Sequence, residues 1–223
     1  MARPPARRRR NPVPYHHGDL ARAVLDEAAA MIATHGVPAC NLREIARRIG
    51  VSHAAPYRHF ADRRAVLTAL HIEGSERLAG AIEQALIETA GDLRRQFLAA
   101  GHAYVRFALD HPGHFQAMFS TEVDHESPLA VVAKGRSFGL LLAYIAEAQR
   151  AKLFEAIDPA RLATPIWAMH HGLATLAAAG AFDDHDDAGL RRTIDDAHAR
   201  LLDGLLVVRP PAPAPGRHPK SKR

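Results

Sequence analysis

The stretch that decides the fold is NLREIARRIGVSHAAPYRHFADRRAVL, residues 41–67. Asn41 is a favoured N-cap residue, and Glu44 follows three residues later, where a capping box places its acid. The apolar residues that follow the cap recur at the spacing of one helical face: Leu42, Ile45, Ala46 and Ile49. Gly50 is expected to end the helix. The pattern therefore predicts a short, capped helix.

A second short helix is predicted from His53 to about Phe60, because Ser52 before it is a good N-cap. The outward side chains near its start are short or polar, so a DNA groove could admit it. Pro56 falls at its first turn, where a missing N–H is best tolerated. Two short helices joined by a tight turn are typical of a helix-turn-helix DNA-binding module.

This stretch resembles the helix-turn-helix of the TetR family of bacterial repressors. The matching residues are Gly50, Val51, Ser52, Tyr57, His59, Phe60, Val66 and Leu67. The departures are Asn41 for the usual Thr or Ser, Ala55 and Pro56 for Thr and Leu, and Arg63 for a common Lys. Far downstream, IWAMHHGLATL resembles the signature of the WHG type of TetR C-terminal domain, through Trp167, His170 and Gly172.

The resemblance implies an all-α protein. Its N-terminal part would be a three-helix helix-turn-helix DNA-binding domain, and its larger part a helical ligand-binding and dimerisation domain. We expect a basic arm over 1–15, a DNA-binding domain over 16–76 with its motif at 41–60, a regulatory domain over 77–208 and a basic tail over 209–223. Such a protein would be a ligand-responsive repressor, acting as a homodimer on a palindromic operator, without a cofactor.

Composition agrees with a soluble helical protein. The 223 residues are 48% hydrophobic but only 6% aromatic, which suits a helical core of reasonable size. Cys40 is the single cysteine, so an internal disulfide and a cysteine-rich zinc site are excluded. No run of about 18 apolar residues suggests a membrane span. We therefore expect a cytoplasmic protein located at the nucleoid and no membrane partner.

Charge is distributed unevenly along the chain. Residues 1–70 carry a balance of +7, residues 71–208 a balance of −7, and the last fifteen residues add +5. A polyanion should therefore be attracted to the N-terminal third and repelled by the middle. This asymmetry is expected of a protein with a separate DNA-binding head.

Periodicity and breakers predict further helices around this motif. A helix over 19–35 carries Leu20, Val24, Ala28 and Met31 on one stripe and stops at Gly36. A long helix from Asp62 to about Gly91 should link the two domains. The remaining helices are expected at about 93–110, 113–119, 128–157, 160–181 and 187–208.

The resemblance also assigns DNA contacts. Base reading would fall to Arg43 and to the start of the second motif helix, at Ser52, His53, Ala54 and Ala55. The phosphate contacts would be made by Tyr57, His59 and Arg63. Arg58 could be either a specific contact or a solvated surface charge. Arginine can donate two hydrogen bonds to guanine, and an alanine methyl can touch the methyl of thymine. Phe60 is expected to be a core residue instead.

Two further sets of residues are predicted for the regulatory domain. The candidate pocket lining, which could equally be plain core, is Phe97, Tyr104, Phe107, Phe115, Met118, Phe119, Phe138 and Tyr144. By resemblance, the last two long helices would form a four-helix dimer interface, with candidates Trp167, His170, Ala174, Ala177 and Ala178. His170 is expected to pack with Trp167, with a position in the ligand pocket as the alternative.

Other function classes are less well supported. The histidine pairs His16/His17, His111/His114 and His170/His171 invite a metal-sensor hypothesis, but adjacent histidines on a helix point about 100° apart, and we predict no metal site. No nucleophile elbow, phosphate loop or paired carboxylates indicate an enzyme. A DNA-packaging protein that ignores sequence stays open, because the basic tails would suit it.

Overall fold

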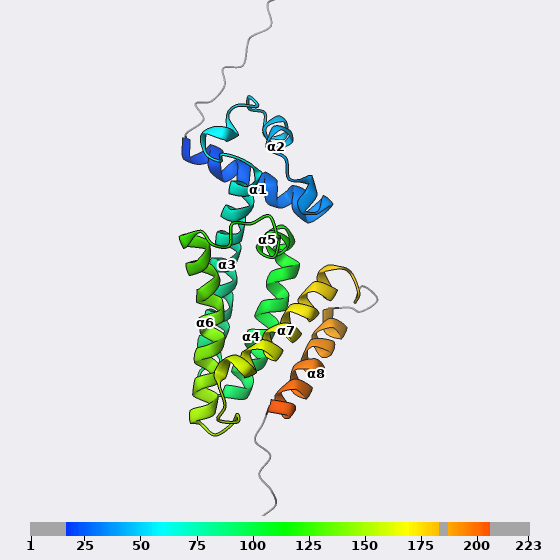
Figure 1. The fold of residues 1–223 in the computed structure, drawn as a ribbon. Helices are drawn as coiled ribbons and strands as arrows, with labels where there is room; N and C mark the ends of the chain where they lie inside the picture. The colour runs from blue at the N-terminus through cyan, green and yellow to red at the C-terminus, as the bar shows by residue number, and fades with distance from the viewer. Residues whose placement is uncertain (1–16, 183–186, 206–223) are drawn as a thin grey trace, which may run out of the picture.

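The computed structural model describes residues 17–182 and 187–205, so the predicted arm over 1–15 and tail over 209–223 lie outside the described residues. Within those ranges the protein is all-α, as predicted. Figure 1 shows a small head, formed by α1, α2 and the start of α3, above an elongated helical body. The α-helices are α1 (His17–His35), α2 (Leu42–Arg48), α3 (Arg63–Glu88), α4 (Leu93–Asp110), α5 (Pro112–Met118), α6 (Pro128–Arg150), α7 (Pro159–Ala178) and α8 (Asp187–Leu205).

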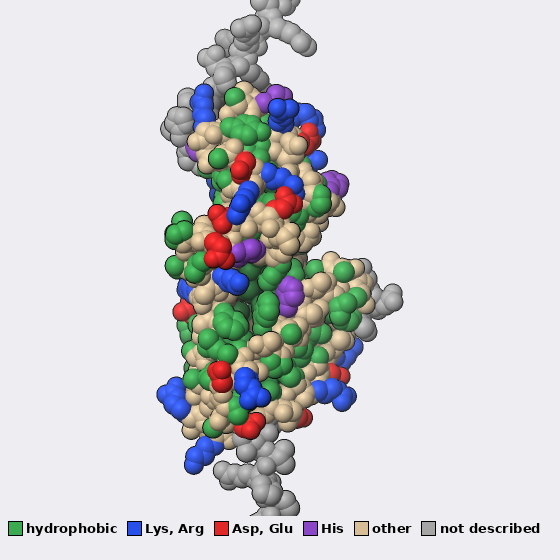
Figure 2. All heavy atoms as spheres, viewed as in Figure 1, with side chains coloured by type: hydrophobic (Ala, Val, Ile, Leu, Met, Phe, Trp, Pro, Cys, Tyr) green, Lys and Arg blue, Asp and Glu red, His purple; other side chains and the backbone are tan. Residues whose placement is uncertain are grey.

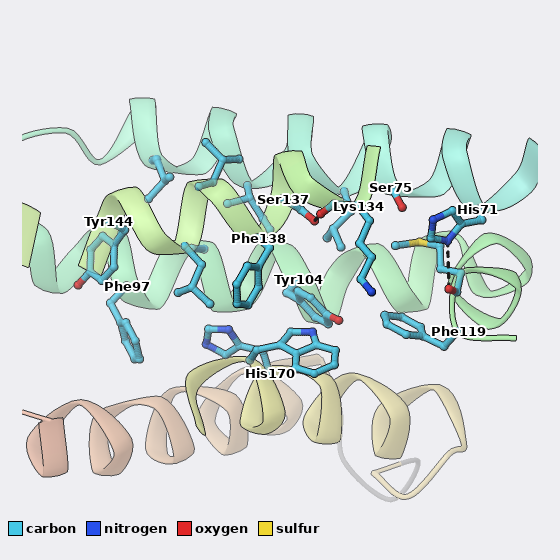
Figure 3. A pocket seen from close by; sticks show the side chains of 18 of the residues that line it. His71, Ser75, Phe97, Tyr104, Phe119, Lys134, Ser137, Phe138, Tyr144 and His170 are labelled. Carbon is cyan, nitrogen blue, oxygen red and sulfur yellow. Dashed lines mark hydrogen bonds between the residues drawn. The ribbon is translucent and has the colours of Figure 1, made fainter. Parts of the chain in front are cut away.

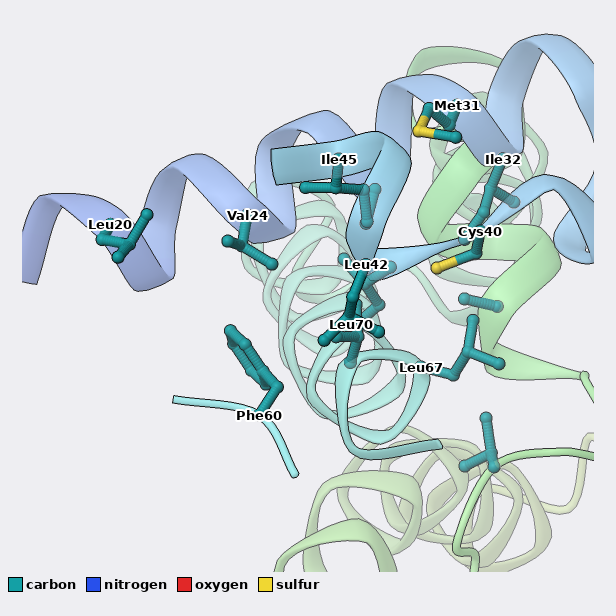
Figure 4. Packing of buried hydrophobic residues seen from close by; sticks show 14 residues of the cluster. Leu20, Val24, Met31, Ile32, Cys40, Leu42, Ile45, Phe60, Leu67 and Leu70 are labelled. Carbon is teal, nitrogen blue, oxygen red and sulfur yellow. The ribbon is translucent and has the colours of Figure 1, made fainter. Parts of the chain in front are cut away.

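The head has its own hydrophobic core (Figure 4). The predicted stripe of α1 is buried there, at Leu20, Val24, Ala28 and Met31. Leu67 and Leu70 enter this core from α3, and Cys40 and Phe60 are buried in it, as small and aromatic core residues. The three-helix head therefore forms because α1, α2 and the first turns of α3 each present an apolar face to the others.

Helix α2 begins and ends largely as the sequence indicates. The side-chain oxygen of Asn41 accepts hydrogen bonds from the N–H groups of Arg43 and Glu44, at 2.9 and 3.3 Å. At the other end, Gly50 has a φ of 74°, and the N–H of Val51 donates to the carbonyl of Ala46 at 3.0 Å, as in a Schellman motif. The reciprocal half of the capping box was predicted wrongly, because the Glu44 carboxylate pairs with arginines instead.

The second motif helix is shorter than predicted. Instead of a helix from His53 to Phe60, a turn leads into a single 3-10 turn, η2 (Pro56–Arg58). The N–H of Ala55 donates to Ser52, and that of Arg58 donates to Ala55, both across three residues. Pro56 has no N–H with which to continue an α-helical ladder from Ser52, which accounts for the tighter winding. The chain still reverses direction here before α3 begins.

Helix α3 joins the head to the body. Its 26 residues span about 39 Å. Leu67 and Leu70 lie in the head core, Leu78 lies in a second cluster with α4 and α5, and Leu86 packs against a third with α4, α6 and α8. Helix α3 therefore contributes side chains to the core of the head and to both clusters of the body.

Helix α5 makes the second junction between the two parts. It crosses α1 so closely that a Cβ on Gly113 would lie 2.0 Å from the carbonyl oxygen of Ala29. Glu73 of α3 adds ion pairs at the same place, with Arg22 of α1 at 2.7 Å and with Arg77. Although burial raises the pKa of Glu73, the hydrogen bond from Arg22 and the charge of Arg77 bring it below its usual value.

Two helix ends in the body differ from the predicted positions, and a third cannot be compared. Helix α6 ends at Arg150, well before residue 157, because Lys152 adopts a left-handed conformation with a φ of 59° and the N–H of Leu153 donates back to Ala148. Helix α7 ends at Ala178 with Gly180 in the same conformation. Helix α8 is described to Leu205, and residues 206–208 of the predicted helix lie outside the described part.

Helix α6 is also notably apolar. Of the described helices, it is the one that is long and apolar enough to cross a membrane, which is weak evidence because core helices pass the same test. It packs along α3, and it carries Lys134 and Arg136 within its length. Phe138, Leu141 and Tyr144 of this helix line the cavity described below, whereas Leu129, Val131 and Val132 near its start are exposed.

Candidate DNA-binding surface and effector cavity

The residues predicted to read bases lie at the surface of the head. Arg43, Ser52, His53 and Ala54 are exposed, whereas Ala55 is half-buried. Tyr57 is 48% exposed although it follows the buried Pro56. Arg58 is exposed, and His59 is half-buried. The turn at 52–58 therefore presents small side chains, a phenol and a guanidinium, which suit contacts with base edges and phosphates.

The arginines of α2 differ in their partners. Arg47 and Arg48 both pair with Glu44, and Arg48 also reaches Glu27 at 3.2 Å. The hydrogen bonds from Arg47 and Arg48 lower the pKa of Glu44 to about 2. Among the residues that the structure describes, no carboxylate forms an ion pair with Arg43. Arg43 is therefore the α2 guanidinium that can donate to a base without first breaking a contact.

Arg63, which is predicted to contact phosphate, has contacts within the protein in this conformation. Its guanidinium donates to the carbonyl of Val37 at 2.8 Å and pairs with Glu122 of the loop between α5 and α6, also at 2.8 Å. The next residue, Arg64, pairs with Asp124 of the same loop at 3.1 Å. These pairs hold the start of α3 against the body, so Arg63 joins the two domains in this conformation.

The body contains a cavity of about 640 Å³ among α3, α4, α6 and α7. Figure 2 shows hydrophobic side chains around a hollow in the middle of this face, and Figure 3 shows the lining from close by. The volume falls in the range of small-molecule sites. The lining is mostly apolar and aromatic and includes no Asp or Glu; its members with polar groups are His71, Ser75, Tyr104, His125, Lys134, Ser137, Tyr144, Trp167 and His170.

Most, but not all, of the predicted pocket residues line this cavity. Those that do are Phe97, Tyr104, Met118, Phe119, Phe138 and Tyr144. Phe107 and Phe115 do not; both are at most 4% exposed and pack in the cluster between α4 and α5. Of the lining residues with polar groups, only Tyr104, Tyr144 and, as an alternative position, His170 were predicted from the sequence. A polar residue on an otherwise apolar helix face, such as Ser75 on α3, was the available signal.

His170 lies in the cavity wall, which was the alternative prediction. Its ring is 4.7 Å from that of His198 and 5.7 Å from that of Phe97, centre to centre. Its expected packing with Trp167 stays a prediction, and the ring of His171, one turn after Trp167, lies 5.8 Å from the indole, centre to centre. Burial lowers the pKa of His170 to about 3, so this imidazole is neutral at physiological pH.

The predicted dimer residues are divided between the two sides of α7. His170, Ala174 and Ala177 are buried within the chain itself, where α7 packs against α4. Trp167 is 40% exposed at the cavity, and Ala178 is exposed. The opposite side of α7 is open and carries small or apolar residues at helical spacing, at Thr164, Pro165, Ala168, Thr175, Leu176 and Ala179.

The histidines form aromatic contacts within the body. His111 and His114 lie 6.1 Å apart, ring to ring, and His114 approaches Glu73 at 3.7 Å. Over residues 17–182 and 187–205, no group of three or more metal-ligating side chains comes together. His16 lies outside the described residues. The contacts of His111 and His114 are those of packed rings at the head–body junction.

Comparison with known proteins agrees with this arrangement. Residues 24–70 match the bacterial regulatory proteins of the tetR family, and residues 97–200 match the tetracyclin repressor-like C-terminal domain. The chain belongs to the TetR family. The second match includes Trp167, His170 and Gly172, and the members of this family are generally regulators without enzymatic activity.

Three relatives illustrate the range of similarity. A protein of unknown function from Rhodococcus sp. RHA1 is 37% identical, with a TM-score of 0.74 over 86% of this chain and 98% of its own. The uncharacterized HTH-type transcriptional regulator YobS of Bacillus subtilis is 24% identical over 85% of this chain and 94% of its own. The TetR-family regulator PfmR from Thermus thermophilus, 20% identical, shares the fold with a TM-score of 0.66 over 83% of this chain and 99% of its own.

Proposed function

We propose that this TetR-family DNA-binding regulator is a ligand-responsive repressor, located at the nucleoid, that binds a palindromic operator as a homodimer. The observation that carries the proposal is the 640 Å³ cavity, which α3 lines from His71 to Leu86 while its first turns belong to the head. A ligand that favours one position of α3 would shift the population of heads able to fit DNA. Residues 16–76 would bind DNA and residues 77–208 would bind the ligand and the second subunit.

The homodimer is supported by the exposed side of α7. One short recognition turn offers too few contacts for useful specificity, whereas two such turns related by a two-fold axis can read half-sites about 34 to 36 Å apart. Ala168 and Thr175 of α7, with Ala179 at its C-cap, would permit two helices to approach closely, and Leu176, 51% exposed, would gain burial there.

Replacing Arg43 should test base reading. Arg43→Ala removes a guanidinium from both half-sites of the dimer, and each specific base contact contributes about 1 to 3 kcal/mol, so operator affinity is expected to fall about a hundredfold or more. Fluorescence anisotropy on an operator selected from random duplexes measures this loss.

The matched control is Arg150→Ala, at the far end of α6, which removes the same charge away from the head. It should change the affinity by less than about threefold. Equal losses in the two variants would mean that Arg43 acts only through net charge, and the assignment of base reading would be abandoned.

A further inference from the structure

The cavity has a polar end and an apolar end. Along α3 its lining runs from His71 and Ser75 to Leu86, a length of about 22 Å. Figure 3 shows His71, Ser75, Lys134 and Phe119 towards one end and Phe97 and Tyr144 at the other. A long, narrow ligand with one polar head would match this division.

At the apolar end the polar side chains are the neutral ring of His170, 5.7 Å from that of Phe97, and the hydroxyl of Tyr144. The walls of this end are formed by Leu86, Phe97, Leu141 and Tyr144. The one hydroxyl there, on Tyr144, already donates to the carbonyl of Leu93 at 2.8 Å. Burial of a hydrocarbon chain or ring system against these residues would be favourable by the hydrophobic effect alone.

At the polar end, Lys134 is the only Lys or Arg among the described residues that line the cavity. Its side chain extends from α6 into the cavity, and its ammonium lies towards Tyr104 and Phe119 (Figure 3). Within the described part of the chain no carboxylate pairs with Lys134, and none lines the cavity. Lys134 is exposed, so solvent also reaches it, but an ammonium at the mouth of an apolar cavity and without an acidic partner favours an anionic ligand group over a neutral or cationic one.

The neighbouring groups are neutral hydrogen-bonding groups. His71 is 3% exposed, and its Nδ1 donates to the carbonyl of Met118 at 3.1 Å, which leaves its buried Nε2 as an acceptor without a protein partner. Burial lowers the pKa of His71, so its ring adds no charge. Ser75, 1% exposed, adds a neutral hydroxyl to the same end of the lining.

From this arrangement we infer that the effector is an elongated amphipathic carboxylate, of the class of a free fatty acid or a similar acid with an extended apolar body. Its carboxylate is bound by Lys134, and its apolar part lies along α3 towards Phe97 and Tyr144. The inference rests on the proposed ligand response and specifies the chemistry of the ligand. The aromatic walls alone would also suit a cationic ligand, but Lys134 would repel it and no acid would balance it.

The chain carries its own probe for the test. Trp167 is the single tryptophan, and it lines the cavity, so its fluorescence should change when the cavity is filled. Full-length protein is titrated with laurate, with methyl laurate and with dodecyltrimethylammonium, each below its micelle concentration. The variants are Lys134→Met, which keeps the chain length but loses the charge, and Lys152→Met, a matched loss of charge at a position that does not line the cavity.

We expect the unaltered protein and Lys152→Met to bind laurate at least tenfold more tightly than methyl laurate. Lys134→Met should lose about tenfold or more in laurate affinity and bind methyl laurate as before. The inference is overturned if laurate and its ester bind alike, if Lys134→Met binds laurate unchanged, if the ammonium compound binds best, or if no probe binds.

A parallel measurement separates this inference from the proposed function. Operator affinity is determined with and without saturating laurate. If laurate binds without changing the affinity for DNA, the proposal of a ligand-responsive repressor is contradicted, whereas the proposed class of ligand is retained. Release of DNA by a neutral or cationic compound, without laurate binding, would overturn the ligand class and leave the ligand response intact.

Discussion

Gly113→Ala is expected to destabilise the protein strongly by separating α1 from α5. The new Cβ would meet the carbonyl oxygen of Ala29 at 2.0 Å, and a backbone atom cannot swing aside as a side chain can. Overpacking typically costs 1 to 3 kcal/mol, so we expect a loss of about 3 kcal/mol and a fall in Tm of about 10 °C. Thermal unfolding followed by circular dichroism measures the change.

Gly135→Ala is the control for this substitution. Gly135 lies on the exposed side of α6, and nothing lies within 4 Å of a Cβ built there. The change should be neutral or stabilise the helix by up to about 1 kcal/mol. If Gly113→Ala melted at the same temperature as Gly135→Ala, α1 and α5 could not be in the close contact described above.

Acidification to pH 5 is expected to lower the free energy of unfolding by at least about 2 kcal/mol. Burial lowers the pKa of His71, His114, His170, His171 and His198 in the folded state. The unfolded chain therefore takes up protons first as the pH falls below about 6.5, at about 1.4 kcal/mol per pH unit for each histidine that stays neutral. The stability that these neutral histidines contribute is fully present above pH 6.5 and decreases as the pH falls. For His170 the decrease continues until the pH reaches its folded-state pKa of about 3.

Urea titrations at pH 7 and pH 5 test this prediction. Carboxylates whose pKa is lowered in the folded state, such as Glu44 and Glu73, change the stability only below about pH 4.5. They therefore do not contribute between pH 7 and pH 5. His170→Asn should lower stability at pH 7 but reduce the pH dependence. A urea midpoint that is the same at both pH values would show that the buried histidines are not held neutral.

The head was largely predictable because its signals are local. The stripe of α1, the Asn41 cap and the stop at Gly50 each depend on residues within a few positions of one another. The shortened recognition turn was harder to predict from the sequence, because Pro56 can either begin a helix or prevent its propagation. The end of α6 was missed for a related reason: the left-handed residue is Lys152, and no glycine marks the stop.

The cavity and the dimer surface depend on which side of each helix meets which neighbour. Phe97 and Phe107 lie on the same helix, yet one faces the cavity and the other packs against α5. Ala174 and Ala177 looked suitable for a subunit interface because they are small, but α4 of the same chain covers them. Tertiary packing decides which side of a helix faces the cavity or a neighbouring helix, and residue type alone does not reveal it.

Specific DNA binding by the purified protein is the most direct test of the account. Fluorescence anisotropy would compare the protein's own upstream intergenic DNA with a shuffled duplex at two salt concentrations. We predict a preference of about a thousandfold or more for the upstream DNA that persists at the higher salt. Nearly equal binding to both duplexes that collapses as salt rises would contradict the account and indicate a DNA-packaging protein instead.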